Sequence, residues 1–174
     1  MEDLIDKLKE LAPADQQEML LWFKEKLFKL KKERRDPTAN YRPPVKRREV
    51  VWVDFGVNVG QELKGKHPGI ILYSNDKSGT AVVIPLTSKN NKADFVIDLG
   101  EIDGMEIEFS YAKVDQITTI SKLRIISKRN PADGKWYAHI NKTTGLFCRP
   151  RATADQMDLI DNKMAEYRSK SAKF

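Results

Sequence analysis

A polar stretch bracketed by glycines, residues 59–68, holds the side chains best suited to acid–base chemistry. It contains one carboxylate, Glu62, one imidazole, His67, and two lysines, Lys64 and Lys66. Imidazole titrates near pH 6.5 and therefore transfers protons close to neutral pH. The stretch is a candidate catalytic loop, although a solvent-exposed loop with no chemical task can have the same composition.

Two strand-forming runs flank this loop. Residues 49–55 and 69–73 are rich in β-branched and aromatic residues, which suit a half-buried pleated surface. Together they predict a hairpin whose connection is longer than usual, and long loops between short strands are often functional. The hairpin would hold His67 where the backbone turns.

Composition predicts one ordinary domain with appendages. The chain has 174 residues, of which 40% are hydrophobic, enough for a core. No run approaches the roughly 20 apolar residues of a spanning helix, and Met1-Glu2-Asp3 lacks the order of a secretory signal. We therefore expect a cytoplasmic protein without a membrane partner. The single Cys148 agrees with a reducing compartment.

The net charge of +6 lies outside the central part of the chain. Residues 1–48 hold 13 Lys and Arg against 9 Asp and Glu, and residues 149–174 hold 6 against 4. The central residues 49–148 hold 12 of each sign. Charge alone therefore gives the central domain no signature of nucleic-acid binding, and solvated charged flanks are the commoner interpretation.

The first part of the chain predicts a helical extension over residues 1–35. Its second helix, from Asp15 to about Arg35, has a broad apolar stripe formed by Met19, Leu20, Phe23, Leu27 and Leu30. The stripe is expected to pack against the first helix or the central domain, or alternatively to dock a partner. Prolines then predict an extended linker over residues 36–46.

Residues 47–174 have the pattern of a small antiparallel barrel closed by a helix. Short apolar runs predict strands over 50–55, 70–73, 80–86, 95–99, 107–114 and 117–120. Runs at 135–140 and 146–148 predict a further hairpin, within an insertion at about 128–149. A capping box at Thr153–Gln156 opens a helix at about 153–169. The expected fold class is mainly β with flanking helices.

Three ordered segments resemble the MazF/PemK family of toxin endoribonucleases. The first is the run V-W-V-D-F followed by V-G-Q-E and G-K-H-P, similar to the family's opening strand and loop. The second is V-V-I-P-L-T-S, which looks like the strand that ends in the family's active-site threonine. The third is V-D-Q-I-T-T-I with a following leucine. The first segment comprises residues 51–55, 59–62 and 65–68. The second is residues 82–88, and the third is residues 114–120 with Leu123.

The resemblance implies an SH3-like barrel, commonly a homodimer, that is restrained by a cognate antitoxin. It also implies cleavage of single-stranded RNA without a metal or another cofactor. In that chemistry the ribose 2′-hydroxyl attacks the adjacent phosphorus, which leaves a cyclic phosphate and a free 5′-hydroxyl. The reaction needs a proton acceptor, a proton donor and donor groups around the phosphoryl oxygens. No Cys and His spacing typical of a zinc site occurs in the chain.

The main departure from the family is His67, which stands where the resemblance places an arginine. Arginine is permanently charged and binds phosphate with a planar fork, whereas histidine titrates and offers at most two donors. His67 is therefore expected to be catalytic, as a proton donor to the leaving oxygen. The alternative is a weakened or inactive binding module, and related barrels that poison a protein target give a third possibility.

The resemblance gives roles to two further catalytic candidates. Thr87 matches the family's active-site threonine, and because a hydroxyl is a poor base we expect it to orient the phosphate. Glu62 matches the family's loop glutamate and is expected to position His67 or to accept a proton.

Five residues are expected to contact the RNA. Ser88 adds a second hydroxyl beside the active-site threonine, and Lys64 and Lys66 attract phosphate. Tyr73 is placed to stack on an unpaired base. Gln116 either contacts a base edge or braces the loop.

Overall fold

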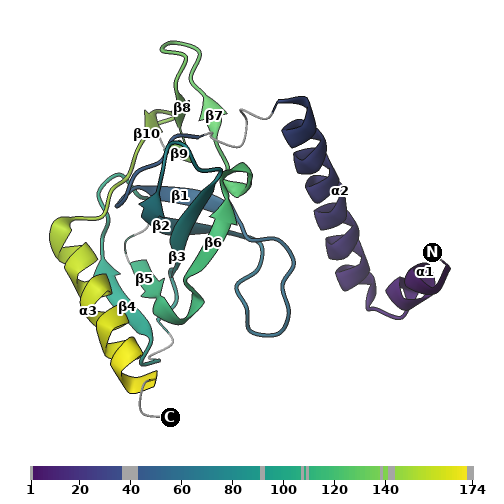
Figure 1. The fold of residues 1–174 in the computed structure, drawn as a ribbon, viewed down its shortest axis with the longest axis horizontal. Helices are drawn as coiled ribbons and strands as arrows, with labels where there is room; N and C mark the ends of the chain where they lie inside the picture. Colours follow the sequence, from purple (N-terminus) through teal and green to yellow (C-terminus); the bar gives the residue numbers. More distant parts are fainter. Residues whose placement is uncertain are drawn as a thin grey trace.

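The computed structural model describes residues 2–36, 43–90, 93–106, 108, 110–137, 139–140 and 144–171. A curved antiparallel sheet stands at its centre, with helix α3 (Ala154–Ser171) against the sheet and the two N-terminal helices, splayed apart, on the other side (Figure 1). Residues 37–42 of the predicted linker 36–46 lie outside the described part of the chain.

Six strands form the central sheet. Their order is β1-β2-β3-β5-β4, and β6 pairs with the first half of β3. The strands are β1 (Val50–Asp54), β2 (Lys66–Ser74), β3 (Thr80–Thr87), β4 (Val96–Gly100), β5 (Ser110–Lys113) and β6 (Thr118–Ser121). The predicted class, mainly β with flanking helices, is confirmed.

The sheet curls without closing into a complete barrel. The strand order ends at β1 and β4, and these two strands are not paired within the described residues. A single antiparallel bridge joins Val53 of β1 to Ile125, and the amide of Ile126 donates to the carbonyl of Trp52. These contacts bring the segment after β6 back to β1, which gives the partly closed curvature expected of an SH3-like sheet.

Each face of the sheet has its own core, because successive strand residues point to opposite sides. Ile70, Leu72, Ile84 and Leu86 pack with helix α3 (Ala154–Ser171) on one face. Val51, Val53, Ile71, Val83 and Ile120 form the core of the other face. The candidate site lies on the sheet face that carries the second core.

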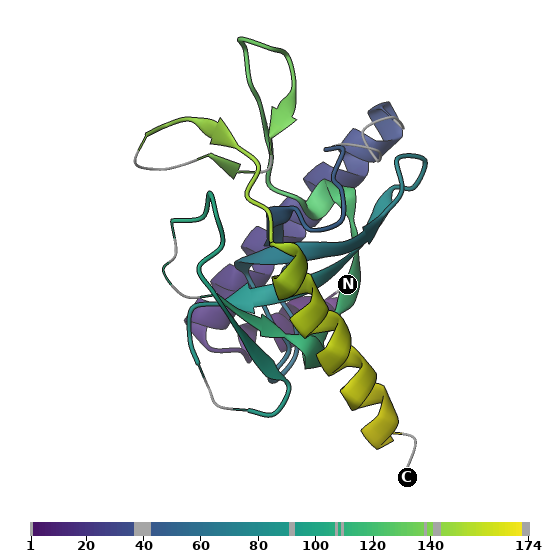
Figure 2. The same cartoon turned by 90° about the vertical axis from the view of Figure 1, so that its left-hand side faces the viewer.

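Helix α3 begins with the predicted capping box. The Thr153 hydroxyl accepts from the amide of Gln156, and the Gln156 side chain accepts from the amide of Thr153. Buried Met157 and Ile160 then fix the helix against the sheet (Figure 2). The reciprocal cap satisfies two backbone donors that would otherwise lack partners.

The N-terminal extension contains α1 (Glu2–Lys9) and α2 (Pro13–Arg35). Helix α2 buries no residue completely, and the predicted apolar stripe from Met19 to Leu30 is exposed. Packing of that stripe against the first helix or the sheet is therefore not observed. The residues of α2 that approach the sheet are Trp22 and Lys29, on another side of the helix.

Two small hairpins occupy the segment before α3. Strand β9 (His139–Ile140) pairs with β10 (Phe147–Cys148), which confirms the predicted hairpin, and β7 (Lys128–Arg129) pairs with β8 (Trp136–Tyr137). The β7–β8 pairing was not anticipated from the sequence. None of the described helices has both the length and the apolar character that a bilayer crossing requires.

Candidate active site

His67 lies in strand β2 and not in the turn where the sequence placed it. Strand β2 begins at Lys66, so the connection after β1 is shorter than predicted. The Cα register pairs His67 with Val53 of β1. His67 is half-buried and shares a sheet face with Val53, which belongs to the second core.

Thr87 occupies the matching position on the neighbouring strand. Gly69 of β2 pairs with Pro85 of β3, and His67 and Thr87 each lie two residues beyond that pair. Because side chains alternate with a period of two, both project from the same face of the sheet. The structure therefore brings together the two residues that the sequence singled out most strongly.

Lys113 is a third polar residue on this face, and sequence reasoning missed it. Thr87 pairs with Tyr111 of β5, and Lys113 lies two residues further along the same strand. Its half-buried side chain is near enough for its charge to act on His67. Its importance depends on the pairing of β3 with β5, which no local sequence pattern indicates.

The environment of His67 favours its neutral form. Burial of the ring lowers its pKa from the ordinary 6.5, a hydrogen bond with the backbone of Lys64 opposes this shift, and the Lys113 charge lowers the pKa further. Burial disfavours an imidazolium, and so does a nearby cation. Burial and the Lys113 charge thus both favour the uncharged form of His67.

The hydroxyl groups of Thr87 and Ser88 differ in their surroundings. The Thr87 Oγ1 accepts from the amide of Lys89 at 3.1 Å, which fixes the turn after β3. Its own proton can still be donated to a ligand. Ser88 is exposed in the bend that follows β3.

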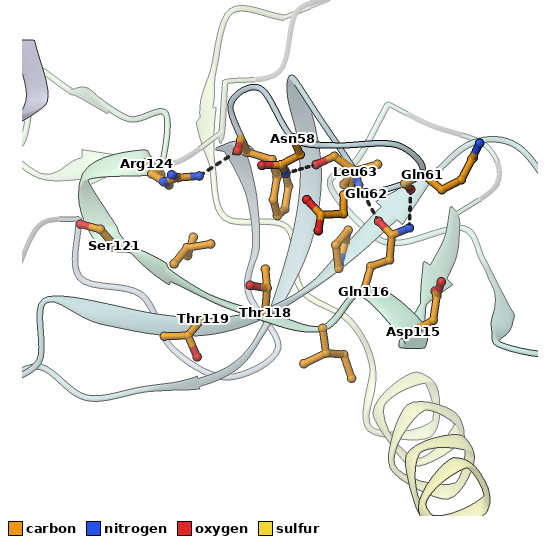
Figure 3. A pocket seen from close by; sticks show the side chains of 14 residues that line it. Asn58, Gln61, Glu62, Leu63, Asp115, Gln116, Thr118, Thr119, Ser121 and Arg124 are labelled. Atoms are coloured by element: carbon orange, nitrogen blue, oxygen red, sulfur yellow. Dashed lines mark hydrogen bonds between the residues drawn. The ribbon is translucent and has the colours of Figure 1, made fainter. Parts of the chain in front are cut away.

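An open cavity of about 800 Å³ lies on the same face, between the β1–β2 loop and the segment from Asp115 to Arg124 (Figure 3). Pro85 of β3 is part of its lining, and so are Glu62 and Gln116. His67 and Thr87 are not among the lining residues. The predicted site residues therefore fall into two neighbouring groups, one on the strands and one around the cavity.

Gln116 braces the loop, one of its two expected roles. Its Oε1 accepts from the amide of Leu63 at 2.8 Å, and its Nε2 donates to the carbonyl of Gln61 at 3.0 Å. The side chain of Asn58 closes the loop from within by donating to the carbonyl of Leu63 at 2.6 Å (Figure 3). The Glu62 carboxylate accepts from the amide of Val59 at 3.3 Å.

Two polar residues of the cavity wall were not predicted. Arg124, in the 3-10 helix η3 (Lys122–Arg124), donates to the carbonyl of Phe55 at 2.8 Å and so holds the end of β1. Asp115, in the 3-10 helix η2 (Val114–Gln116), has a raised pKa because burial disfavours its charge, which the Lys113 charge partly offsets. The shift places a carboxyl that gains protons more readily beside the cavity.

The side chains of the remaining predicted contacts are exposed. Lys64 is exposed in the loop, and Lys66 points to the groove between α2 and β1. Tyr73 is 62% exposed at the far end of β2, six residues and about 20 Å from His67. A role for Tyr73 would need an RNA that spans several nucleotides.

The described residues contain no group of three or more His, Cys, Asp or Glu side chains placed to hold one metal ion. The polar atoms at the site belong instead to an imidazole, an ammonium group, hydroxyls and amides. These groups suit proton transfer and the binding of an anion.

Comparison with known proteins places this arrangement in a family. The model of PemK-like, MazF-like toxins of type II toxin–antitoxin systems matches residues 46–147, more than half of the chain and all of the candidate site. No curated protein sequence matches this chain.

Solved structures include two that resemble this chain. MazF from Deinococcus radiodurans (Form-I) has a TM-score of 0.51 at 17% identity, over 72% of this chain and 96% of that one. An endoribonuclease in complex with its cognate antitoxin from a Mycobacterial species has a TM-score of 0.46 at 18% identity, over 70% and 92%. The Deinococcus match supports the fold, and the family match over residues 46–147 shows that this chain belongs to the PemK-like, MazF-like toxins of type II toxin–antitoxin systems.

Proposed function

We propose that the protein is a toxin endoribonuclease that cleaves single-stranded RNA without a metal. The observation that carries the proposal is the placement of His67 and Thr87 on one face of adjacent strands, inside the region that matches the toxin family. The imidazole can move a proton, and the hydroxyl can bind a phosphoryl oxygen.

In the proposed reaction the ribose 2′-oxygen forms a bond to phosphorus while the bond from phosphorus to the 5′-oxygen breaks. Neutral His67 takes the 2′ proton as the attack proceeds. The imidazolium so formed then gives a proton to the leaving 5′-oxygen, so the imidazole ends the cycle uncharged. The lowered pKa of His67, caused first by burial, suits this order because the acceptor form is present at pH 7.

Lys113 supplies the positive charge that an arginine at position 67 would provide. Its ammonium lies on the same sheet face as His67 and Thr87 and can supply the positive charge that a neutral imidazole lacks. Negative charge grows on the phosphoryl oxygens during attack, and a positioned cation stabilises it. Thr87 donates to the same oxygens, and Glu62 holds the loop in the orientation that admits the substrate.

Single-stranded RNA would enter along the cavity beside the loop. The cavity wall offers Gln116, Thr118 and Arg124, which can contact bases or phosphates. Ser88, Lys64, Lys66 and Tyr73 remain proposed contacts further along the strand, and the two lysines would make binding weaken with salt.

An antitoxin and a second copy of the chain are the proposed protein partners. One similar structure is described as an endoribonuclease in complex with its cognate antitoxin, and another as MazE-MazF from Deinococcus radiodurans. We extend this arrangement to the present chain as part of the proposal. Light scattering of the purified protein measures the homodimer directly.

A binding module without catalysis is the second candidate, and the histidine at position 67, where the resemblance places an arginine, favours it. A neutral imidazole supplies no charge in place of arginine, so the site would fail if Lys113 did not compensate. Such a module would bind RNA or the antitoxin and leave RNA intact.

One assay separates the two candidates. The purified protein is incubated with a mixed-sequence single-stranded RNA in excess chelator, and the ends of the products are analysed. The nuclease predicts fragments with cyclic phosphate and 5′-hydroxyl ends, which are lost in His67→Ala. An RNA that stays intact at every protein concentration would refute the enzyme and leave the binding module.

A further inference from the structure

Helix α2 contacts the sheet near the base of the β1–β2 loop. The groove between them, about 730 Å³, is lined by Trp22 and Phe28 of α2 and by both ends of the loop at 54–57 and 65–66. Figure 1 shows the helix standing beside this loop. Helix α2 also precedes residues 46–147, so the family match does not account for it.

The first contact is between Trp22 and Gly56. Gly56 has a positive φ of 80°, and a side chain built on it would overlap the Trp22 indole. The ammonium of Lys26 lies 4.8 Å from the centre of the same ring, on α2 itself. The indole is thus held between Lys26 of its own helix and Gly56 near the start of the loop.

The second contact is an ion pair between Lys29 and Asp54. The Lys29 Nζ donates to the Asp54 Oδ2 at 2.7 Å, and both side chains are largely buried. The other carboxylate oxygen of Asp54 accepts from the amide of Gly56 at 3.1 Å. Pairs with this degree of burial keep more of their Coulomb energy than exposed ones.

Backbone hydrogen bonds continue this network to the imidazole. The Gly56 carbonyl accepts from the amide of Gly65, and the Gly65 carbonyl accepts from the amide of Phe55, each at 2.8 Å. The residue before Gly65 is Lys64, whose backbone is hydrogen-bonded to the His67 side chain. A chain of contacts therefore runs from α2 through both ends of the loop to the ring.

We propose that α2 is a clamp on the catalytic loop, in which Trp22 and Lys29 are positioning residues that hold Gly56 and Asp54 and thereby orient His67. The catalytic part of this inference rests on the proposed nuclease function. The structural part does not, because it concerns the loop in the protein alone. Loss of the clamp frees the loop ends and exposes the imidazole to water.

The test compares two double variants of the full chain. Trp22→Ala with Lys29→Met removes the clamp, whereas Phe23→Ala with Lys31→Met makes the same kinds of change at exposed positions of the same helix. Lys29→Arg keeps a cation for Asp54 and is the conservative control. Thermal unfolding of each variant separates loss of the clamp from loss of the fold.

Two readouts need no RNA. Hydrogen exchange at the Phe55 and Gly65 amides should accelerate about tenfold in the clamp variant, because local opening there costs less free energy. The pKa of His67, followed by NMR, should rise toward 6.5 as the ring becomes hydrated, since burial is the largest cause of its shift. The exposed-position control and Lys29→Arg should leave both unchanged.

Cleavage kinetics give the third readout, with kcat several-fold lower and KM within about twofold in the clamp variant. Unchanged amide exchange, or equal acceleration in the exposed-position control, would overturn the clamp. Faster exchange with an unmoved imidazole pKa would overturn the link to His67. If the unmodified protein cleaves no RNA, the nuclease proposal fails, and exchange and the imidazole pKa still decide the clamp.

Discussion

Lys113 and His67 lie on the same face of the sheet, on strands that flank β3, and the lysine charge adds to burial in lowering the pKa of the imidazole. Each residue therefore changes what the other can do. In the proposed mechanism, burial and the lysine charge both favour the neutral imidazole, which can accept a proton, and the lysine supplies the positive charge that this imidazole lacks. A single arginine could supply the positive charge but could not accept a proton, since it does not release its own. The proposal therefore assigns the charge to Lys113 and the proton transfer to His67.

Removal of the Lys113 ammonium should separate these two effects. Lys113→Ala is expected to lower kcat by roughly 100-fold through loss of phosphoryl stabilisation, and to raise the pKa of His67 because one cause of its depression is gone. Lys113→Arg should retain most activity. Kinetics and an NMR titration measure the two effects, and Lys128→Ala on exposed β7 is the control. An unchanged rate in Lys113→Ala would remove this lysine from the mechanism.

The pH dependence follows from the direction of the His67 shift. The rate of the initial attack requires neutral imidazole, so kcat should rise with pH through a midpoint below the ordinary 6.5 and then level off. His67→Ala should cut no RNA at any pH in this range. A rate that falls as pH increases from 6 to 7 would instead mean that the imidazolium is the form required.

The same shift makes folding stability depend on pH. The unfolded chain gains a proton on His67 at about pH 6.5, whereas the folded protein gains it only at lower pH. Stability should therefore be highest above pH 6.5 and decline as pH falls through the folded pKa. Urea unfolding of the protein and of His67→Asn should show this contribution only in the unmodified chain.

Substitution of the family residue tests whether the histidine is specialised. His67→Arg restores a permanent charge but removes the proton acceptor, so we expect a loss of cleavage similar to that of His67→Ala. A gain in cleavage over the unmodified protein would show that the site has decayed and would favour the binding module. Single-turnover assays with saturating protein exclude an effect on RNA binding alone.

Gln116 should matter for the loop more than for the fold as a whole. Gln116→Ala removes the donor and the acceptor that hold Gln61 and Leu63, which should destabilise the loop by about 1–3 kcal/mol. Gln61→Ala is the matched control because Gln116 contacts only the Gln61 backbone. Amide exchange at Leu63 should accelerate in the first variant and stay constant in the second; equal exchange in both would contradict the bracing role.

The sequence predicted the strands and the closing helix because these depend on local patterns. The continuous apolar run from Ala81 to Leu86 and the capping box at Thr153 each specify an element without reference to distant residues. His67 and Thr87 were found through a resemblance that follows chain order. Their placement on one face depends on the register of β2 against β3, which only the folded sheet defines.

Lys113 and the contacts of α2 could not be found in the same way. The proposed role of Lys113 depends on the pairing of β5 with β3. That of Trp22 depends on its contact with Gly56, which lies 34 residues further along the chain. The predicted apolar stripe of α2 is exposed, and the residues that meet the sheet, Trp22 and Lys29, lie on another side of the helix. Long-range pairing of this kind leaves no periodic signal in the sequence.

The proposed enzyme is tested most directly by the chemistry of one bond. After the cleavage position has been mapped, an RNA with a single 2′-deoxy nucleotide at that position is compared with the unmodified RNA, in chelator, with His67→Ala alongside. The proposal predicts that the unmodified RNA yields cyclic phosphate and 5′-hydroxyl ends, that the deoxy bond stays intact, and that His67→Ala cuts neither. Cleavage at the deoxy position, or a 5′-phosphate on the product, would contradict it.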